Sequence, residues 1–286
     1  MAQSQGYGCE LYAGGAEGLN GTKLNQVFTY MRDSTVTFLG EPDANGIAIG
    51  SGTFVEYGEI RGILTCSHVL RAITASNKVN IAGHEYRDAI GITKNLTVRN
   101  HDIVEFPNIA NSQPDLGFLR IDDEEAASLK ARYSFLNGNK HSELSEKPEP
   151  DSDHSLHFLS GAFEHLTTKK SYDGSTATII LATHHTQGQV VKRQEVGDHD
   201  YLTFIPDPME ENREQLPPTF AATSGGGLWK YYLRKLPDNS VKLVEFRFTG
   251  IAFFQSGEQP NQITCHGPMS VHKTLKTKIN EKWPSG

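Results

Sequence analysis

Residues 221–229 read Ala-Ala-Thr-Ser-Gly-Gly-Gly-Leu-Trp, a serine followed by three glycines and two apolar residues. Glycine is needed where the backbone takes a positive φ or where another group approaches closely. A serine hydroxyl is a weak nucleophile unless a base lies within hydrogen-bond reach, and neighbouring amide N–H groups can stabilise a developing oxyanion. Glycine-serine runs are also common in surface turns, so Ser224 becomes informative only together with the rest of the chain.

Two further segments supply the groups that such a serine would need. Residues 50–55 read Gly-Ser-Gly-Thr-Phe-Val, and a turn at Tyr57-Gly58 leads to a strand expected at 60–64. Residues 65–68, which follow this strand, read Thr-Cys-Ser-His. Residues 115–121 read Asp-Leu-Gly-Phe-Leu-Arg-Ile, an aspartate that opens a strand-like apolar run. Each of these segments also has an ordinary interpretation. The histidine could simply be packed in the fold, and an aspartate at the start of a strand is common in turns.

Taken in chain order, the three segments place His68, Asp115 and Ser224 at separations of 47 and 109 residues. Here the sequence resembles the trypsin/chymotrypsin-like serine proteases, whose catalytic residues follow the order His, Asp, Ser. The matching blocks are Thr-Cys-Ser-His at 65–68, Asp-Leu-Gly-Phe-Leu at 115–119 and Ser-Gly-Gly at 224–226. The resemblance covers residues 34–280 and is nearer to the bacterial and intracellular members than to the secreted, disulfide-bonded ones.

The strand pattern agrees with that resemblance. Short segments rich in valine, isoleucine, threonine and phenylalanine alternate with turn residues, which predicts an all-β protein. Among the strands we expect are those at 35–39, 116–121, 241–248 and 250–254. The resemblance implies two six-stranded antiparallel β-barrels followed by a C-terminal helix, which we expect at 269–282. We divide the chain into an N-terminal extension (1–33), a first barrel with His68 and Asp115 (34–136), a linker (137–154) and a second barrel with Ser224 and the helix (155–286).

Composition narrows the setting. The chain has 286 residues, of which 37% are hydrophobic and 21% charged, as in ordinary soluble globular proteins. Its formal net charge of −7 argues against broad nucleic-acid binding. No apolar run is long enough to span a bilayer, and the first residues lack the pattern of a secretory signal. The chain has only three cysteines, which fits a reducing compartment, so we expect a cytoplasmic protein. From the net charge and the lack of a long apolar run, we expect that it binds neither nucleic acids nor membranes.

The resemblance implies a serine endopeptidase that uses a catalytic triad and no metal or cofactor. Ser224 would attack the peptide carbonyl, His68 would transfer the proton, and Asp115 would orient the imidazole ring. The backbone N–H groups of Ala222 and Ser224 would form the oxyanion hole. An adjacent pair, His184 and His185, does not suggest a metal site, because neighbouring strand residues point to opposite faces.

Two positions depart from the family pattern. Ala222 stands where the family has a glycine, so we expect that the oxyanion hole could be unformed until a substrate or partner completes it. Thr223 stands where the secreted enzymes have the aspartate of their zymogen switch, so that switch cannot operate here. We therefore expect narrow specificity or activation by a partner protein.

The substrate pocket is expected at two places. Pro218 lies at the family's pocket base, beside Thr219, and no acidic residue is present there to select lysine or arginine. The segment containing Ala252, Phe253 and Phe254 resembles the strand that binds the substrate backbone, and an aromatic ring there would favour a small or apolar residue. Both aromatic residues could equally belong to the core.

Two alternatives remain open at this stage. The first is a peptide- or protein-binding module on the same fold with little turnover, for which Ala222 is the main support. The second is hydrolysis of an ester or another non-peptide substrate. The α/β-hydrolase version of an esterase is disfavoured, because its Gly-x-Ser-x-Gly motif and its order Ser, Asp, His are both missing.

Overall fold

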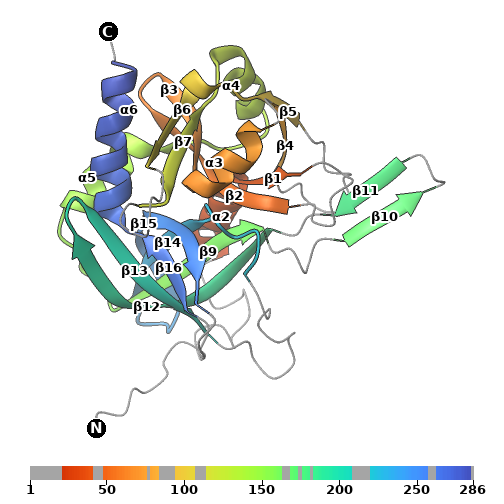
Figure 1. Cartoon of the computed structure of the whole chain (residues 1–286). Helices are drawn as coiled ribbons and strands as arrows, with labels where there is room; N and C mark the ends of the chain where they lie inside the picture. Colours follow the sequence, from red (N-terminus) through yellow and green to blue (C-terminus); the bar gives the residue numbers. More distant parts are fainter. Residues whose placement is uncertain are drawn as a thin grey trace.

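The protein consists mainly of β-strands arranged in two units. The structure is a computed structural model that describes residues 21–40, 48–75, 78–83, 94–106, 114–162, 168–172, 176–180, 183–207, 220–256 and 262–284. The two sheets lie one above the other, and α6 (Lys276–Lys282) stands beside the upper sheet (Figure 1). The predicted fold class, all-β with two strand-rich units and a C-terminal helix, is confirmed.

The first sheet is antiparallel in the order β5-β4-β1-β2-β3-β7-β6, and the short β8 pairs in parallel with β2. Every residue of β1 is buried, including its two threonines, Thr35 and Thr37. Within the described residues this sheet curls without closing, so the first unit is a half-barrel, whereas a closed six-stranded barrel was expected. Its strands are β1 (Thr35–Leu39), β2 (Ala48–Tyr57), β3 (Ile60–Thr65), β4 (Lys78–Gly83), β5 (Lys94–Thr97), β6 (Ile103–Phe106), β7 (Leu116–Arg120) and β8 (Leu136–Asn137).

The second sheet is a closed six-stranded barrel in the order β12-β13-β16-β15-β14-β9, as predicted. In β13, buried and half-buried residues alternate, as they do when one face of a strand lines a barrel interior. A separate hairpin, β10–β11, projects from the body of the molecule (Figure 1). The strands are β9 (His154–Ala162), β10 (Thr168–Tyr172), β11 (Thr176–Ile180), β12 (Thr183–Val196), β13 (His199–Pro206), β14 (Gly227–Lys235), β15 (Val241–Gln255) and β16 (Ile263–His266).

The helices connect and cover the sheets. At the start of α4 the carboxylate of Asp122 accepts a hydrogen bond from the Glu125 N–H over 2.8 Å, which is ordinary N-capping. The segment 137–154, expected to be a linker, contains α5. None of the described helices is long and apolar enough to cross a membrane. The helices are α2 (Gly21–Asp33), α3 (Ser67–Thr74), α4 (Asp123–Lys130), α5 (Gly138–Glu146) and α6 (Lys276–Lys282), with a 3-10 turn η1 (Asn100–Asp102) and a π-helical segment η3 (Met269–Leu275) before α6.

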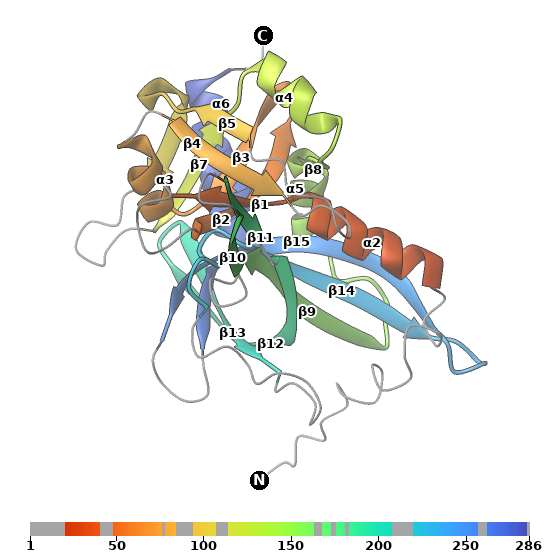
Figure 2. The ribbon, with the colours of Figure 1, turned by 90° about the vertical axis from the view of Figure 1, so that its right-hand side faces the viewer.

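One apolar core joins the two units. Phe54 of the first sheet and Trp229 and Phe248 of the barrel belong to the same buried cluster. Helix α2 lies alongside β14 and β15 (Figure 2), and its Phe28 packs edge-on against Phe158 with ring centroids 5.1 Å apart. Because this shared core holds the sheets together, chain segments that end at their junction are held at fixed distances from one another.

Candidate functional site

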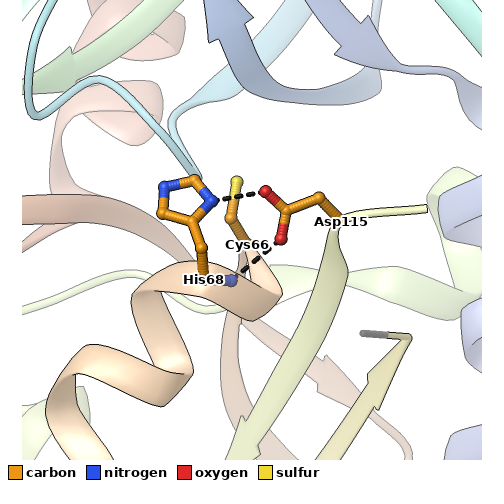
Figure 3. Close-up of side chains that lie close together, drawn as sticks. All are labelled: Cys66, His68 and Asp115. Carbon is orange, nitrogen blue, oxygen red and sulfur yellow. Dashed lines mark hydrogen bonds and ion pairs between the residues drawn. The ribbon is translucent and has the colours of Figure 1, made fainter. Parts of the chain in front are cut away.

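His68 and Asp115 meet because the strands beside them pair. Strands β3 and β7 are antiparallel neighbours, with Thr65 opposite Gly117, so the chain leaving β3 lies next to the chain entering β7. The Asp115 carboxylate accepts two hydrogen bonds from His68, one from the main-chain N–H over 2.8 Å and one from ring Nδ1 (Figure 3). The histidine lies in the first turn of α3, whereas a plain turn after the strand was expected.

Electrostatics defines the protonation of this pair. Asp115 is buried, which by itself would raise its pKa, but the hydrogen bonds from His68, together with the charge of this ring when it is protonated, outweigh burial and lower the pKa of the carboxyl below its ordinary value. An ionised carboxylate can only accept hydrogen bonds, so Nδ1 of His68 carries the proton and donates it. The Nε2 lone pair is then available as a base, on a side chain that is 42% exposed.

A buried thiol lies beside this pair. Cys66 donates its Sγ–H to the Ala252 carbonyl over 3.2 Å, and candidate ligand atoms of Cys66, His68 and Asp115 all lie within 4.8 Å of one another (Figure 3). A thiol, an imidazole and a carboxylate are the side-chain types that bind Zn²⁺ in proteins. Here, however, Nδ1 of His68 and the Asp115 carboxylate are hydrogen-bonded to each other and not free to bind a metal ion. Burial and the Asp115 charge also raise the pKa of the Cys66 thiol, which disfavours the thiolate that a metal would need. We interpret Cys66 as packing support for Asp115.

Ser224 belongs to the same network through its main chain. Its carbonyl accepts the Ser51 N–H over 2.7 Å, and the next residue, Gly225, donates its N–H to the Ala252 carbonyl over 2.7 Å. The Ala252 carbonyl therefore binds both the residue after Ser224 and Cys66, two residues before His68. The described residues show no hydrogen bond between the Ser224 hydroxyl and the His68 ring, a bond that is often long in enzymes without substrate.

The turn before Ser224 is strained. Ala222 has a φ of +68°, and the Thr223 N–H donates to the Phe220 carbonyl over 3.1 Å. A positive φ at only the third residue of a four-residue turn is the type II pattern, which favours glycine. The left-handed conformation costs roughly 1–2 kcal/mol for a residue with a Cβ. The structure thus places an alanine in the glycine-like conformation, although the sequence left this open.

The main-chain donors of this turn divide into two groups. Thr223, Gly225 and Gly226 each donate to a carbonyl. Within the part of the chain that the structure describes, the N–H groups of Ala222 and Ser224 donate to no backbone carbonyl. These two are the donors expected to form the oxyanion hole.

The predicted substrate-contacting residues are only partly described. Pro218 and Thr219 lie outside the described residues. Ala252 is buried, with its carbonyl engaged as above. Phe254 is 58% exposed, so it is not a core residue. Phe253 is half-buried and stacks on the ring of His266, with centroids 4.1 Å apart and planes at 18°.

Sequence reasoning missed three residues that contact the candidate triad. These are Cys66, which lies within the histidine motif, Ser51, which lies within an expected strand, and His266, which lies outside every motif. His266 lies in β16, fully buried, and its Nε2 is 3.0 Å from the Asp115 carbonyl oxygen. Only the glycines on either side of Ser51 could have drawn attention to it, and no local signal marks the other two.

Comparison with known proteins finds distant structural similarity alone. No protein-family model matches the sequence, and no curated protein does so either. A serine-to-alanine variant of Rv3671c from M. tuberculosis H37Rv, in an inactive form, has a TM-score of 0.45 and 12% identity over 92% of this chain and 94% of that chain. An inactive form of the Rv3671c protease has a TM-score of 0.43 and 12% identity over 90% and 93%.

A third structure comes from work on the coupled folding and binding of the intrinsically disordered Sesbania mosaic virus VPg protein. Its TM-score is 0.40, with 13% identity over 85% of this chain and 90% of that chain. These similarities are too distant to carry a statement about activity. The chemistry of this protein must therefore be inferred from its own residues.

Proposed function

We propose that the protein is a serine peptidase that cleaves peptide bonds through His68, Asp115 and Ser224. The observation that carries this proposal is the pair of hydrogen bonds from His68 to one Asp115 carboxylate. Bonds to the ring and to the main chain of the same histidine orient the imidazole and select the tautomer whose free Nε2 can act as a base. A histidine that serves only packing has no need of a free Nε2 on an exposed side.

The proposed reaction is acyl transfer. His68 Nε2 takes the proton of the Ser224 hydroxyl while Oγ attacks the substrate carbonyl carbon, and the protonated imidazole is stabilised by Asp115. The oxyanion is bound by the N–H groups of Ala222 and Ser224. His68 then donates its proton to the leaving amine, which departs with its C–N bond electrons, and water repeats the sequence to release the acid. No metal or cofactor takes part in these steps.

Substrate and setting are part of the proposal. The substrate is a protein or peptide, with Ala252, Phe253 and Phe254 along its path and Pro218 and Thr219 at the pocket base. The exposed ring of Phe254 supports an apolar contact with the substrate. We place the protein in the cytoplasm, restrained by narrow specificity or by an activating partner, as inferred from the sequence.

Labelling with a fluorophosphonate probe tests this function, because such a probe reacts with a serine that an adjacent base activates. The wild-type protein should be labelled, and both Ser224→Ala and His68→Ala should abolish labelling. Ser155→Ala, which changes an exposed serine of β9, is the matched control and should label like wild type. Labelling that persists in Ser224→Ala would reject the proposed nucleophile.

A binding module on the same fold is the second candidate. The strained Ala222 and the missing hydrogen bond between the Ser224 hydroxyl and the His68 ring, within the described residues, both favour it. Peptides selected from a random library would then bind equally well to wild type and Ser224→Ala, and the wild type would not be labelled. Labelled wild type together with cleavage of selected peptides would reject this candidate.

A further inference from the structure

Three consecutive residues at the start of α3 are each bound by a different part of the fold. Cys66 donates its Sγ–H to a main-chain carbonyl of β15. His68 donates its main-chain N–H and its ring N–H to Asp115 (Figure 3). Between these two residues, the Ser67 hydroxyl donates to Oε2 of Glu105, in β6, over 2.6 Å. The proposed mechanism uses the contact of His68 and leaves the one between Ser67 and Glu105 unexplained.

Strand register places Glu105 beside this helix. Gly117 of β7 is opposite Thr65 of β3 on one side and opposite Glu105 of β6 on the other, so the three residues form one row across the sheet. Residues that are directly opposite each other lie on the same face of a sheet. Helix α3 covers this face, since a Cβ on Gly117 would overlap Leu70 of the helix. The Glu105 side chain therefore lies on the face that α3 covers.

The start of α3 has no capping side chain of its own. Its N-cap residue, Cys66, makes no side-chain capping hydrogen bond, and its first turn contains no acidic residue. The first N–H groups of a helix lack partners within the helix, and negative charge is favourable there. Two carboxylates from other segments take this place, since Asp115 accepts the His68 N–H and Glu105 accepts the hydroxyl of the fully buried Ser67. Tertiary contacts thus decide where the first turn lies.

The contact with Asp115 alone does not fix this turn. Both hydrogen bonds from His68 end on one carboxylate, so the turn can still tilt about that single group. The bond from Ser67 to Glu105 is a second attachment, on a different strand. A hydrogen bond to a carboxylate is about twice as strong as one between neutral groups, and the thiol of Cys66 is a weak donor. Glu105 therefore provides the stronger of the two further attachments.

Glu105 is itself held from the far side of β6. Its main-chain carbonyl accepts a hydrogen bond from Nζ of Lys278, in α6, over 2.9 Å. The same ammonium lies 4.1 Å from the centre of the Phe106 ring, within the range of a cation–π contact. Because α6 packs against β6 in this way, the strand offers α3 a fixed anchor.

We propose that Glu105 is a positioning residue for His68, which acts through the Ser67 hydroxyl to hold the first turn of α3 where the imidazole ring reaches Asp115. This inference rests on the proposed function and deepens it. Glu105 has no contact with the substrate in this role, so its loss should lower kcat and leave KM unchanged. A glutamate that only stabilised the fold would affect the free energy of unfolding and not the kcat of the folded protein.

Steady-state kinetics on a cleaved peptide is the first test. Glu105→Ala and Ser67→Ala should each lower kcat about fivefold to fiftyfold with KM within about twofold, since a misplacement of about 1 Å can cost about a hundredfold. The double variant should lose no more than about twofold beyond the larger single loss, because both changes break the same hydrogen bond. Glu105→Gln, whose amide oxygen still accepts, should keep kcat within about threefold of wild type.

The matched control is Glu56→Ala. Glu56 is another half-buried glutamate of the same sheet, and its carboxylate accepts a hydrogen bond from Nζ of Lys130 over 2.5 Å, at the end of β2 away from His68. Its removal takes away a carboxylate contact without touching α3. This variant should therefore have the kcat and KM of the wild type.

Crystal structures of the same variants give a measurement that does not depend on activity. Nδ1 of His68 should lie within hydrogen-bond range of Asp115 in the wild type, Glu105→Gln and Glu56→Ala. In Glu105→Ala and Ser67→Ala the separation should exceed about 3.5 Å, beyond that range. If Glu105→Ala does not fold, Ser67→Ala takes its place, since it leaves the half-buried carboxylate accessible to water.

The outcomes separate the two proposals. If the wild type is labelled and cleaves peptides, an unchanged contact between His68 and Asp115 in the alanine variants, or a kcat within twofold of wild type, would overturn the role of Glu105 and leave the peptidase function standing. If the wild type shows neither labelling nor cleavage but the contact is lost in the alanine variants, the peptidase function is wrong while the positioning of His68 by Glu105 stands.

Discussion

His266 donates its ring Nε2–H to the main-chain carbonyl of Asp115 over 3.0 Å, and this hydrogen bond joins the closed barrel to the half-barrel beside the candidate catalytic pair. Burial lowers the pKa of His266 to about 3, so the ring is neutral near pH 7. A carbonyl can only accept, so the single ring proton lies on Nε2. Asp115 is thus held from both sides, by His68 through its carboxylate and by His266 through its main chain.

His266→Phe should destabilise the protein by about 1–3 kcal/mol, because it preserves stacking on Phe253 and leaves a buried carbonyl without its donor. Urea unfolding measures the free energy, and the rate of probe labelling relative to that of the wild type measures the effect on Asp115. Tyr201→Phe removes the hydroxyl of another ring next to His266 and should change neither quantity. Unchanged stability in His266→Phe would contradict this role.

Asp115→Asn should lower kcat by about 10³–10⁴-fold with little change in KM, because a neutral amide neither selects the His68 tautomer nor stabilises the imidazolium. Steady-state kinetics on a cleaved peptide measures the effect. Asp122→Asn is the control, since asparagine caps a helix as well as aspartate does, and it should match wild type. A loss of less than tenfold in Asp115→Asn would show that a group other than Asp115 orients His68.

Stability should fall in acid because three buried histidines and the half-buried His157 are neutral in the folded protein. Burial lowers the pKa of His141 and His266 to about 3 and that of His157 and His272 to about 4. The unfolded chain takes up these protons near pH 6.5, so each histidine leaves stability intact above that pH. Each then removes up to about 1.4 kcal/mol per pH unit as the pH falls toward its folded pKa.

Chemical denaturation between pH 8 and pH 4 measures this acid dependence. The slope of unfolding free energy against pH should exceed that of one titrating group below pH 6.5. His101 is 73% exposed, so His101→Gln should leave the slope unchanged. A flat profile down to pH 4.5 would show that these histidines are not neutral in the folded protein.

Gly225→Ala should abolish labelling and destabilise the fold by more than 2 kcal/mol. Gly225 has a φ of +88°, and a Cβ there would overlap the Ser51 carbonyl oxygen and the Thr65 hydroxyl. Overpacking in a well-packed region typically costs about 1–3 kcal/mol, and the left-handed conformation adds to it. Gly197 has a φ of +58° with open space around it, so Gly197→Ala should lose only about 1 kcal/mol and stay active.

Thermal unfolding of the two glycine variants, followed by probe labelling, measures both effects. Equal stability losses at the two positions would show that the contacts around Gly225 are unimportant. A Gly225→Ala variant that is stable but unlabelled would instead show that the substitution displaces Ser224 without destabilising the fold.

Local pattern was sufficient for much of the fold. Strand β1 has the predicted bounds, β3 and β7 differ from prediction by one residue at one end, and the acidic first turn of α4 follows the Asp122 cap. Helix α3 was missed because it is only eight residues long and directly follows a strand. The two strands predicted at 241–248 and 250–254 are one continuous β15, because the Thr249-Gly250 interruption is absorbed by pairing on both sides.

The candidate triad was proposed from three motifs that become informative only in their shared chain order, and the structure brings two of its members, His68 and Asp115, into hydrogen-bond contact. The hydrogen bonds between His68 and Asp115 follow from pairing of β3 with β7, which the strand pattern and the resemblance together made predictable. Closure of the first sheet could not be predicted, since it depends on how far the sheet curls.

The amino-acid sequence by itself determined the all-β class, the order of His68, Asp115 and Ser224, and the presence of an alanine at position 222. The tertiary structure decided which groups support them: Ser51 contacts Ala222 across 171 residues of chain, and His266 contacts Asp115 across 151. Such contacts arise when two sheets pack on a shared core and meet main-chain carbonyls, which every residue possesses. A bond to a group that every residue carries leaves no pattern in the sequence.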